Sequence, residues 1–123
     1  MNGPVSFKKL SWTHHAQAKM MFYRLSPMRV RRVMNSPKRI EEGVAPKTIA
    51  MMQPASLKAA GGRAGALKEE RWTQEIWVMI QDVGRERRVV SAWRYLGVTK
   101  PRGEIAAGFI RKEYNEYAKG PRK

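Results

Sequence analysis

The sequence predicts a single α+β domain in which two N-terminal helices pack on a mostly antiparallel four-stranded sheet, followed by a C-terminal helix. Three observations lead to this prediction. Two helix-like stretches with their own capping residues come early, between residues 13 and 36. Runs rich in β-branched and aromatic residues come later, and the two clearest are separated by a short turn. At 123 residues, the chain can bury one modest core.

The N-terminal elements are assigned from the residues that begin and end them. Phe7 to Thr13 alternates weakly between apolar and polar residues, which indicates a short strand. Thr13 can then cap a first helix, because its hydroxyl can accept an early backbone N–H. Ser26 caps a second helix, and Pro27 fits its first position, where the missing N–H does no harm. Asn-Ser-Pro at 35–37 ends that helix.

Strand-like segments follow the two helices. Residues 39–42 and 48–53 are two short strands or one hairpin, and the glycine-containing stretch 54–70 predicts a mobile basic loop. The run "RWTQEIWVMIQD" at 71–82 has the strongest strand pattern. After a turn, "RRVVSAWRYL" at 87–96 is expected to return antiparallel to it.

A basic extension comes after the sheet. "GVTKPRG" breaks the strand pattern, and residues 104–117 then predict a helix with one apolar side, formed by Ile105, Phe109, Ile110, Tyr114 and Tyr117. We therefore divide the chain into an α+β core at 5–96 and a basic helical extension at 97–123.

The charge balance predicts a polyanionic partner. Lysine and arginine number 25 against 10 acidic residues, a net charge of +15. Nucleic acid, either RNA or DNA, is the first candidate, and an anionic membrane surface is a lesser one. With no cysteine, a disulfide framework and a thiolate metal site are excluded. The two adjacent histidines point in different directions and no acidic cluster accompanies them in the sequence, so neither a metal nor a cofactor is expected. The opening residues lack the apolar core of a signal peptide, and no run approaches a membrane span, so we expect a cytoplasmic protein.

The stretch "HAQAKMMFYRLSPMRVRRVM" at 15–34 resembles the opening of a family of small bacterial domains of uncharacterised function. The likeness is carried by His15-Ala16, Lys19-Met20, Leu25-Ser26 and Val30 with Val33-Met34. The later "EIWVMIQD…RRVVSAWRY" resembles the closing hairpin of that family. The family is grouped with RelE-like and BrnT-like toxins in the barnase–EndoU–colicin–RelE ribonuclease fold. Over roughly residues 7–96, the resemblance implies two helices on a four-stranded antiparallel sheet, metal-independent RNA cleavage and an acidic antitoxin protein as partner.

Four residues are candidates for such catalysis. Histidine as a residue type suits general acid and base roles, so His15 is the first candidate, and a structural role at the helix start is the alternative. Lys19 lies one turn further on the same helical face, so both side chains could meet one phosphate. Arg94 and Tyr95 end the last strand, where such folds place active groups. Because strand neighbours point to opposite faces, we expect Val90, Ala92 and Arg94 on one face and Val89, Ser91, Trp93 and Tyr95 on the other.

Further cations are candidates for phosphate contacts, and three functions stay open. The candidates are Arg24, Arg29, Arg31, Arg32, Arg63, Arg87, Arg88, Lys100 and Arg102. The first hypothesis is a toxin-like ribonuclease, and the second is a nucleic-acid-binding module without catalysis. An imidazole of His15 buried against the sheet would favour the second. The third is a protein-interaction domain, whose last helix would dock through Phe109, Ile110 and Tyr114.

Overall fold

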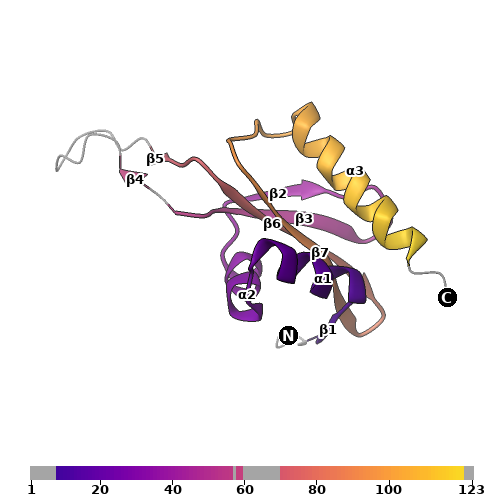
Figure 1. Ribbon diagram of the computed structural model, residues 1–123. Coiled ribbons are helices and arrows are strands. Elements are labelled where there is room, and N and C mark those ends of the chain that lie inside the picture. The colour runs from indigo at the N-terminus through magenta and orange to yellow at the C-terminus, as the bar shows by residue number, and fades with distance from the viewer. Residues whose placement is uncertain (1–7, 57, 60–69, 121–123) are drawn as a thin grey trace, which may run out of the picture.

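The fold is α+β, with a five-stranded mixed sheet between helices. The computed structural model describes residues 8–56, 58–59 and 70–120 (Figure 1). In chain order, the elements are β1 (Lys9–Trp12), α1 (His14–Tyr23), α2 (Pro27–Asn35), β2 (Arg39–Glu42), β3 (Thr48–Pro54), β4 (Lys58–Ala59), β5 (Glu70–Arg71), β6 (Glu75–Val83), β7 (Glu86–Tyr95) and α3 (Glu104–Lys119). The strand order in the main sheet is β1-β7-β6-β3-β2, and β4 pairs with β5 separately.

The first strand corrects the prediction of a four-stranded antiparallel sheet. β1 joins the sheet as a fifth strand and pairs in parallel with β7, from Lys9 opposite Glu86 to Trp12 opposite Val89. The other neighbours in this sheet are antiparallel. An alternating pattern shows that a segment is extended but does not show which strand it joins. Parallel pairing needs a long connection, and here the chain between β1 and β7 supplies it.

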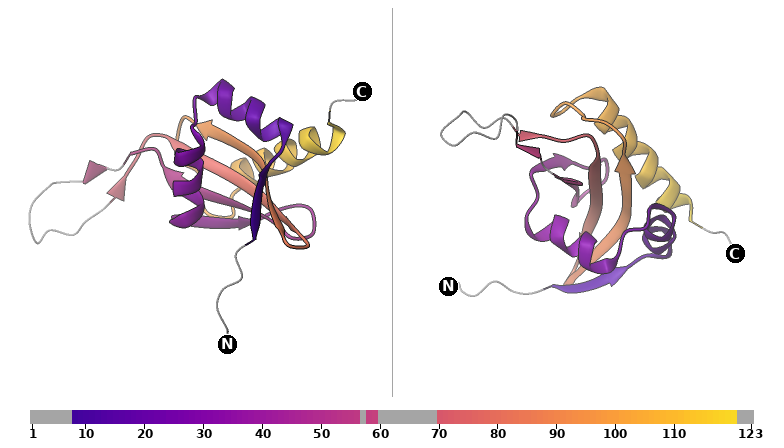
Figure 2. Two further views of the ribbon diagram at one scale, coloured as in Figure 1. Left: turned by 90° about the horizontal axis from the view of Figure 1, so that it is seen from below. Right: turned by 60° about the vertical axis from the view of Figure 1, so that its left-hand side comes forward.

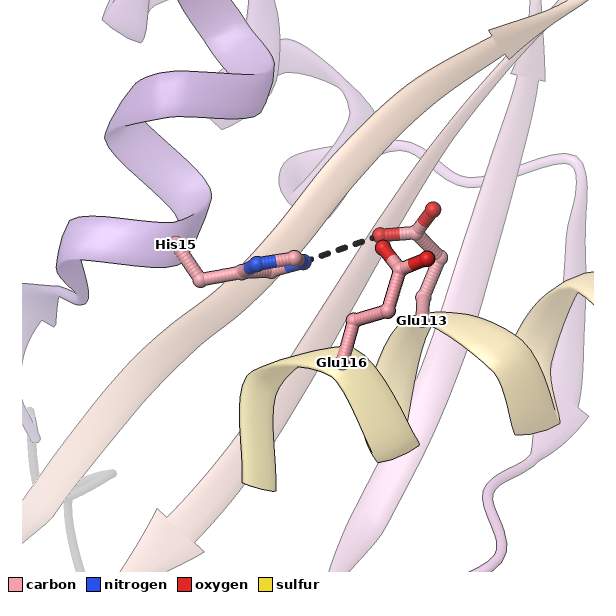
Figure 3. A group of neighbouring side chains, drawn as sticks. All are labelled: His15, Glu113 and Glu116. Carbon is pink, nitrogen blue, oxygen red and sulfur yellow. Dashed lines mark hydrogen bonds and ion pairs between the residues drawn. The ribbon is translucent and has the colours of Figure 1, made fainter. Parts of the chain in front are cut away.

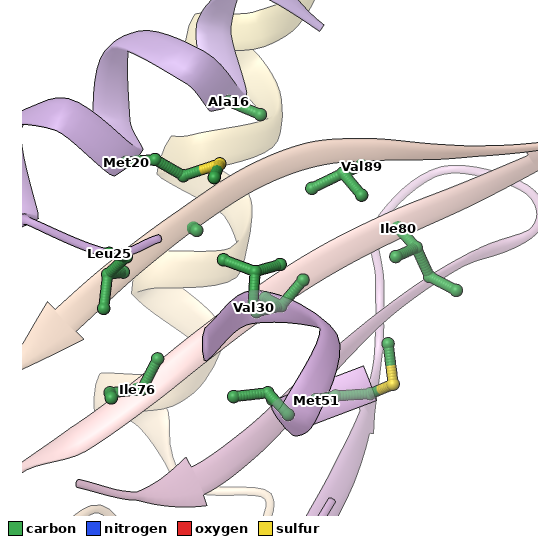
Figure 4. Close-up of a cluster of buried hydrophobic side chains, with 11 residues drawn as sticks. Ala16, Met20, Leu25, Val30, Met51, Ile76, Ile80 and Val89 are labelled. Carbon is green, nitrogen blue, oxygen red and sulfur yellow. The ribbon is translucent and has the colours of Figure 1, made fainter. Parts of the chain in front are cut away.

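Helices cover both faces of the sheet (Figure 2). α1 and α2 bury one face of the sheet in a hydrophobic cluster (Figure 4). Its residues are Ala16, Met20, Leu25, Val30, Val33, Met51, Ile76, Val78, Ile80, Val89 and Ala92. α3 covers the other face through Ala106 and Ile110, which pack on Ala50, Met52, Trp77, Met79, Val90 and Trp93. Phe109 and Tyr114 also pack against this second cluster. The α3 residues through which the third hypothesis would dock a partner therefore contact the protein's own sheet.

The caps of the first two helices are confirmed. The Thr13 hydroxyl accepts a hydrogen bond from the backbone N–H of Ala16, and the Ser26 hydroxyl accepts one from Arg29. Arg24 ends α1 with a left-handed φ of 57°, which lets the chain reverse into α2. These local bonds fix where α1 ends and α2 begins, and both helices pack against the same face of the sheet.

A bulge in β7 changes which of its residues face each helix layer. The pairing of β6 with β7 shifts next to Met79, so β7 contains one extra residue there. As a result, Val89 and Ala92 face α1 and α2, whereas Val90 and Trp93 face α3. The expected grouping of Val90 with Ala92 is wrong, because an inserted residue reverses the alternation of faces.

Part of the predicted basic loop lies outside the described residues. Its candidate Arg63 falls in the range 60–69, whereas the segments on either side pair as β4 and β5. At the opposite end of the strands, a tight turn joins β6 to β7, and Gly84 supplies its positive φ of 59° without a Cβ penalty. Within the described ranges, no helix is long and apolar enough to cross a membrane.

Candidate functional site

A buried carboxylate of α3, Glu113, binds both candidate residues of α1, and Figure 3 shows its contact with His15. Glu113 is 5% exposed, although it is charged. Its Oε1 lies 3.0 Å from Nε2 of His15 and accepts a hydrogen bond of 2.6 Å from the Ser91 hydroxyl. Its Oε2 lies 2.9 Å from Nζ of Lys19. The two α1 residues therefore lie on one helical face, as predicted, but they converge on a carboxylate of the same chain.

The protonation states in this cluster follow from its contacts. Burial opposes ionisation of Glu113, but hydrogen bonds from Ser91, Lys19 and His15 outweigh it and lower the pKa of the carboxyl. Burial likewise acts to lower the pKa of Lys19, yet the hydrogen bond and the charge of Glu113 raise it above its usual value. Because an ionised carboxylate can only accept hydrogen bonds, Nε2 of His15 must donate. In the neutral imidazole, Nδ1 then carries the free lone pair.

A pocket of about 300 Å³ lies beside His15. Its lining residues are Thr13, His14, His15, Arg88 and Tyr117. The rings of His15 and Tyr117 are 6.5 Å apart, and the Tyr117 hydroxyl lies 3.5 Å from a terminal nitrogen of Arg88. His15 is therefore not sealed off, since its side chain keeps 16% of its accessible surface at the edge of this pocket.

Three side chains near the pocket have the right donor atoms for a metal ion. Ligand atoms of His15, Glu113 and Glu116 lie within 4.8 Å of one another. However, the ammonium group of Lys19 already neutralises Glu113 at 2.9 Å. A divalent cation would add charge to a site that already holds a cation. We therefore interpret the cluster as an ion-pair network that joins α3 to α1.

The other two catalytic candidates lie away from His15. Nε of Arg94 donates to the backbone carbonyl of Tyr23, on the α1 and α2 side of the sheet. Tyr95 packs on the α3 side, 4.9 Å from the ring of Phe109. Because Tyr23 follows His15 by eight residues, Arg94 lies about 12 Å further along α1. The structure thus brings His15 and Lys19 together and leaves Arg94 and Tyr95 apart from them and from each other.

The predicted phosphate-binding cations differ in whether they form an ion pair. Arg87 binds both oxygens of Asp82, at 2.8 and 3.0 Å, and these hydrogen bonds raise the pKa of Arg87 and lower that of Asp82. Arg88 lies 3.2 Å from Glu86. In the part of the chain that the structure describes, the exposed side chains without an ion pair include Arg24, Arg31, Arg32, Lys100 and Arg102. Arg31 lies 5.6 Å from the ring centre of Trp12, a contact that leaves its charge uncompensated.

Sequence reasoning missed three residues of the His15 cluster. Glu113, Ser91 and Tyr117 come from strand β7 and helix α3, both far from His15 in the chain. A signal for Glu113 was present, because it follows Ile110 by three residues and therefore lies on the apolar face of its helix. A charged residue at such a position is buried only when it has a partner.

No protein-family model matches the chain, and no curated protein or solved structure matches it either. The likeness of residues 15–34 to the RelE-like and BrnT-like domains therefore stays a prediction. The function has to be argued from the geometry and charge of the described residues.

Proposed function

We propose that this protein binds RNA through the cationic side formed by α1, α2 and the adjoining end of the sheet. The observation that carries the proposal is the charge of residues 8–38, which contain no aspartate or glutamate. These residues form β1, α1 and α2, and the two helices lie on the same face of the sheet. Their positive charge therefore faces one side of the molecule.

The exposed arginines of this side suit phosphate contacts. Arg24 ends α1, and Arg31 and Arg32 are exposed on α2. None of the three forms an ion pair within the described residues. A guanidinium can hold two phosphate oxygens, and its binding releases counterions from the nucleic acid. RNA is placed ahead of DNA because of the likeness of residues 15–34 to ribonuclease-fold domains.

Equilibrium binding with matched double variants tests this proposal. The test variant is Arg31→Gln/Arg32→Gln on α2, and the control is Arg111→Gln/Lys119→Gln on α3, which removes the same charge from the other face of the sheet. Fluorescence anisotropy with labelled single-stranded RNA and DNA gives the affinities. We expect the α2 variant to lose on the order of tenfold in RNA affinity and the control much less. Equal losses would contradict a binding surface on α1 and α2.

Cleavage of the bound RNA at the His15 pocket is the second candidate function. With Nε2–H of His15 held by Glu113, Nδ1 can accept the proton of a ribose 2′-hydroxyl. The 2′-oxygen would attack phosphorus while the bond to the 5′-oxygen breaks. Arg88 could stabilise the charge on phosphorus, and the Tyr117 hydroxyl could protonate the leaving oxygen. Lys19 would then keep Glu113 ionised and would not itself touch the phosphate.

A cleavage assay in EDTA separates the two functions. Labelled RNA is incubated with the wild-type protein, with His15→Ala and with His14→Ala, whose exposed side chain lines the same pocket. Cleavage by the wild type and by His14→Ala, but not by His15→Ala, supports catalysis at His15. Salt-sensitive binding without cleavage leaves a nucleic-acid-binding module.

A further inference from the structure

Half-buried cations in this protein are usually neutralised by a carboxylate. In the described residues, this holds for Lys19 with Glu113, Arg39 with Glu41, Arg87 with Asp82 and Arg88 with Glu86. The exceptions are Arg29 and Arg94, which are also half-buried. A partly buried charge without a counterion is costly, so it needs an explanation.

Among the described residues, both arginines bind only neutral oxygen atoms. Nη1 of Arg29 donates to the side-chain oxygen of Gln53, and Nη2 donates to the carbonyl of Pro54 at 3.2 Å. Nε of Arg94 donates to the carbonyl of Tyr23 at 2.9 Å. These carbonyl groups fix the orientation of each guanidinium and leave its positive charge uncompensated. The two terminal nitrogens of Arg94 make no hydrogen bond within the described residues, so they can bind a ligand.

Strand register brings the two guanidinium groups to the same end of the sheet. Arg94 of β7 lies opposite Ile76 of β6, and Ile76 lies opposite Gln53 of β3. Cα atoms two strands apart are separated by about 10 Å, a distance that two arginine side chains can span. Arg29 reaches this point from α2 through its bond to Gln53.

The cluster also includes Arg32. Burial lowers the pKa of Arg29, and the nearby charges of Arg32 and Arg94 lower it further. Arg29 thus lies close enough to both cations to be repelled by them, and in the described part of the chain none of the three arginines contacts a carboxylate. Such an arrangement is relieved when an anion binds between them.

We propose that Arg29, Arg32 and Arg94 form a phosphate-binding site at the end of the sheet, occupied by a backbone phosphate of the RNA. The identification of the phosphate with RNA rests on the proposed function, whereas the site itself rests on the contacts of these arginines. Neutral acceptors hold Arg29 and Arg94 in place before the ligand arrives, so little side-chain entropy is lost on binding. Arg24, the next exposed cation, follows Tyr23 directly and can extend the contact along the chain of phosphates.

Two measurements on Arg94→Met test the site, with Arg111→Met on the exposed side of α3 as the control. In fluorescence anisotropy with a short labelled oligouridine, we expect Arg94→Met to lose about ten- to a hundredfold in affinity and Arg111→Met only a few-fold. In thermal unfolding, inorganic phosphate should raise the melting temperature of the wild type and of Arg111→Met above that in chloride of equal ionic strength. Arg94→Met should lose this difference.

The outcomes test the existence of the phosphate site separately from the identity of its ligand. Equal RNA affinities of the two variants, together with equal stabilisation by phosphate, would overturn the site. Phosphate stabilisation that is lost only in Arg94→Met, without RNA binding by the wild type, would support the site and refute RNA as its ligand. If Arg94→Met does not fold, Arg32→Met provides the same comparison at an exposed position.

Discussion

Replacing Glu113 with glutamine tests whether one buried carboxylate stabilises the packing of α3 against α1. Glu113 accepts hydrogen bonds from His15 and Ser91 and pairs with Lys19. Glutamine has nearly the same shape, but it has no charge, and one of its two oxygen positions becomes an amide donor. The substitution therefore removes the counterion of Lys19 while it leaves the packing of α3 in place.

The expected loss of stability follows from the burial of both partners. Removing one partner of a buried ion pair costs about 3–5 kcal/mol, because the remaining charge is uncompensated. The side chain of Lys19 is 20% exposed, so water recovers part of this loss. We therefore expect the free energy of unfolding to fall by about 2–3 kcal/mol at pH 7.

The directions of the two pKa shifts predict how the free energy of unfolding changes with pH. The pKa of Glu113 is lower in the folded protein than in the unfolded chain. Its contribution to stability is thus present above the unfolded pKa of about 4.3 and is lost as the pH falls through the folded pKa. The pKa of Lys19 is raised, so the contribution of Lys19 is present below about pH 10 and is lost above it. The difference in the free energy of unfolding between the wild type and Glu113→Gln should therefore be largest near pH 7 and should become smaller in acid.

Urea unfolding followed by far-UV circular dichroism measures this difference in the free energy of unfolding. Glu116→Gln is the matched control, because Glu116 lies one turn away on α3 with an exposed side chain. A Glu113→Gln variant within about 0.5 kcal/mol of Glu116→Gln at pH 7 would refute the role of Glu113. A difference that widens as the pH falls would refute the assigned ionisation.

Three further substitutions test the stability of the fold. Glu75 is completely buried and accepts hydrogen bonds from Trp72, Trp77 and Thr99, so Glu75→Ala should cost about 3 kcal/mol and alter the near-UV circular dichroism of the tryptophans. An unchanged near-UV spectrum would argue against this network. A Cβ at Gly43 would lie 2.0 Å from Oγ1 of Thr48, so Gly43→Ala should lower the free energy of unfolding by about 1–3 kcal/mol. A Cβ at Gly108, inside α3, would meet nothing within 4 Å, so Gly108→Ala should raise the free energy of unfolding by up to about 1 kcal/mol. If Gly43→Ala and Gly108→Ala changed the free energy of unfolding in the same direction, the described packing around these glycines would be contradicted.

Local sequence signals predicted most of the elements correctly. Thr13 and Ser26 cap α1 and α2, and the runs at 71–82 and 87–96 contain β6 and β7 almost entirely. Each of these signals depends on residues that are neighbours in the chain. The parallel pairing of β1 and the bulge next to Met79 depend on contacts between distant segments, which alternation alone does not report.

The same difference between local signals and contacts of distant segments explains which parts of the site were predicted. His15 and Lys19 were expected on one helical face, because a spacing of four residues brings side chains together. Glu113 could not be assigned as their partner, because nothing local shows that α3 lies next to α1. Arg94 was expected on the face of the sheet opposite to Val89 and Tyr95. The bulge instead places Val89 on the same face as Arg94.

The salt dependence of RNA affinity tests the cationic binding surface most directly. The dissociation constant of a labelled single-stranded RNA is measured over a series of potassium chloride concentrations. If the protein neutralises about four phosphates, the logarithm of the association constant should fall with the logarithm of the salt concentration with a slope of about −3. An affinity that hardly changes with salt, or no binding at low salt, would contradict RNA binding by the arginines of α1, α2 and the sheet end.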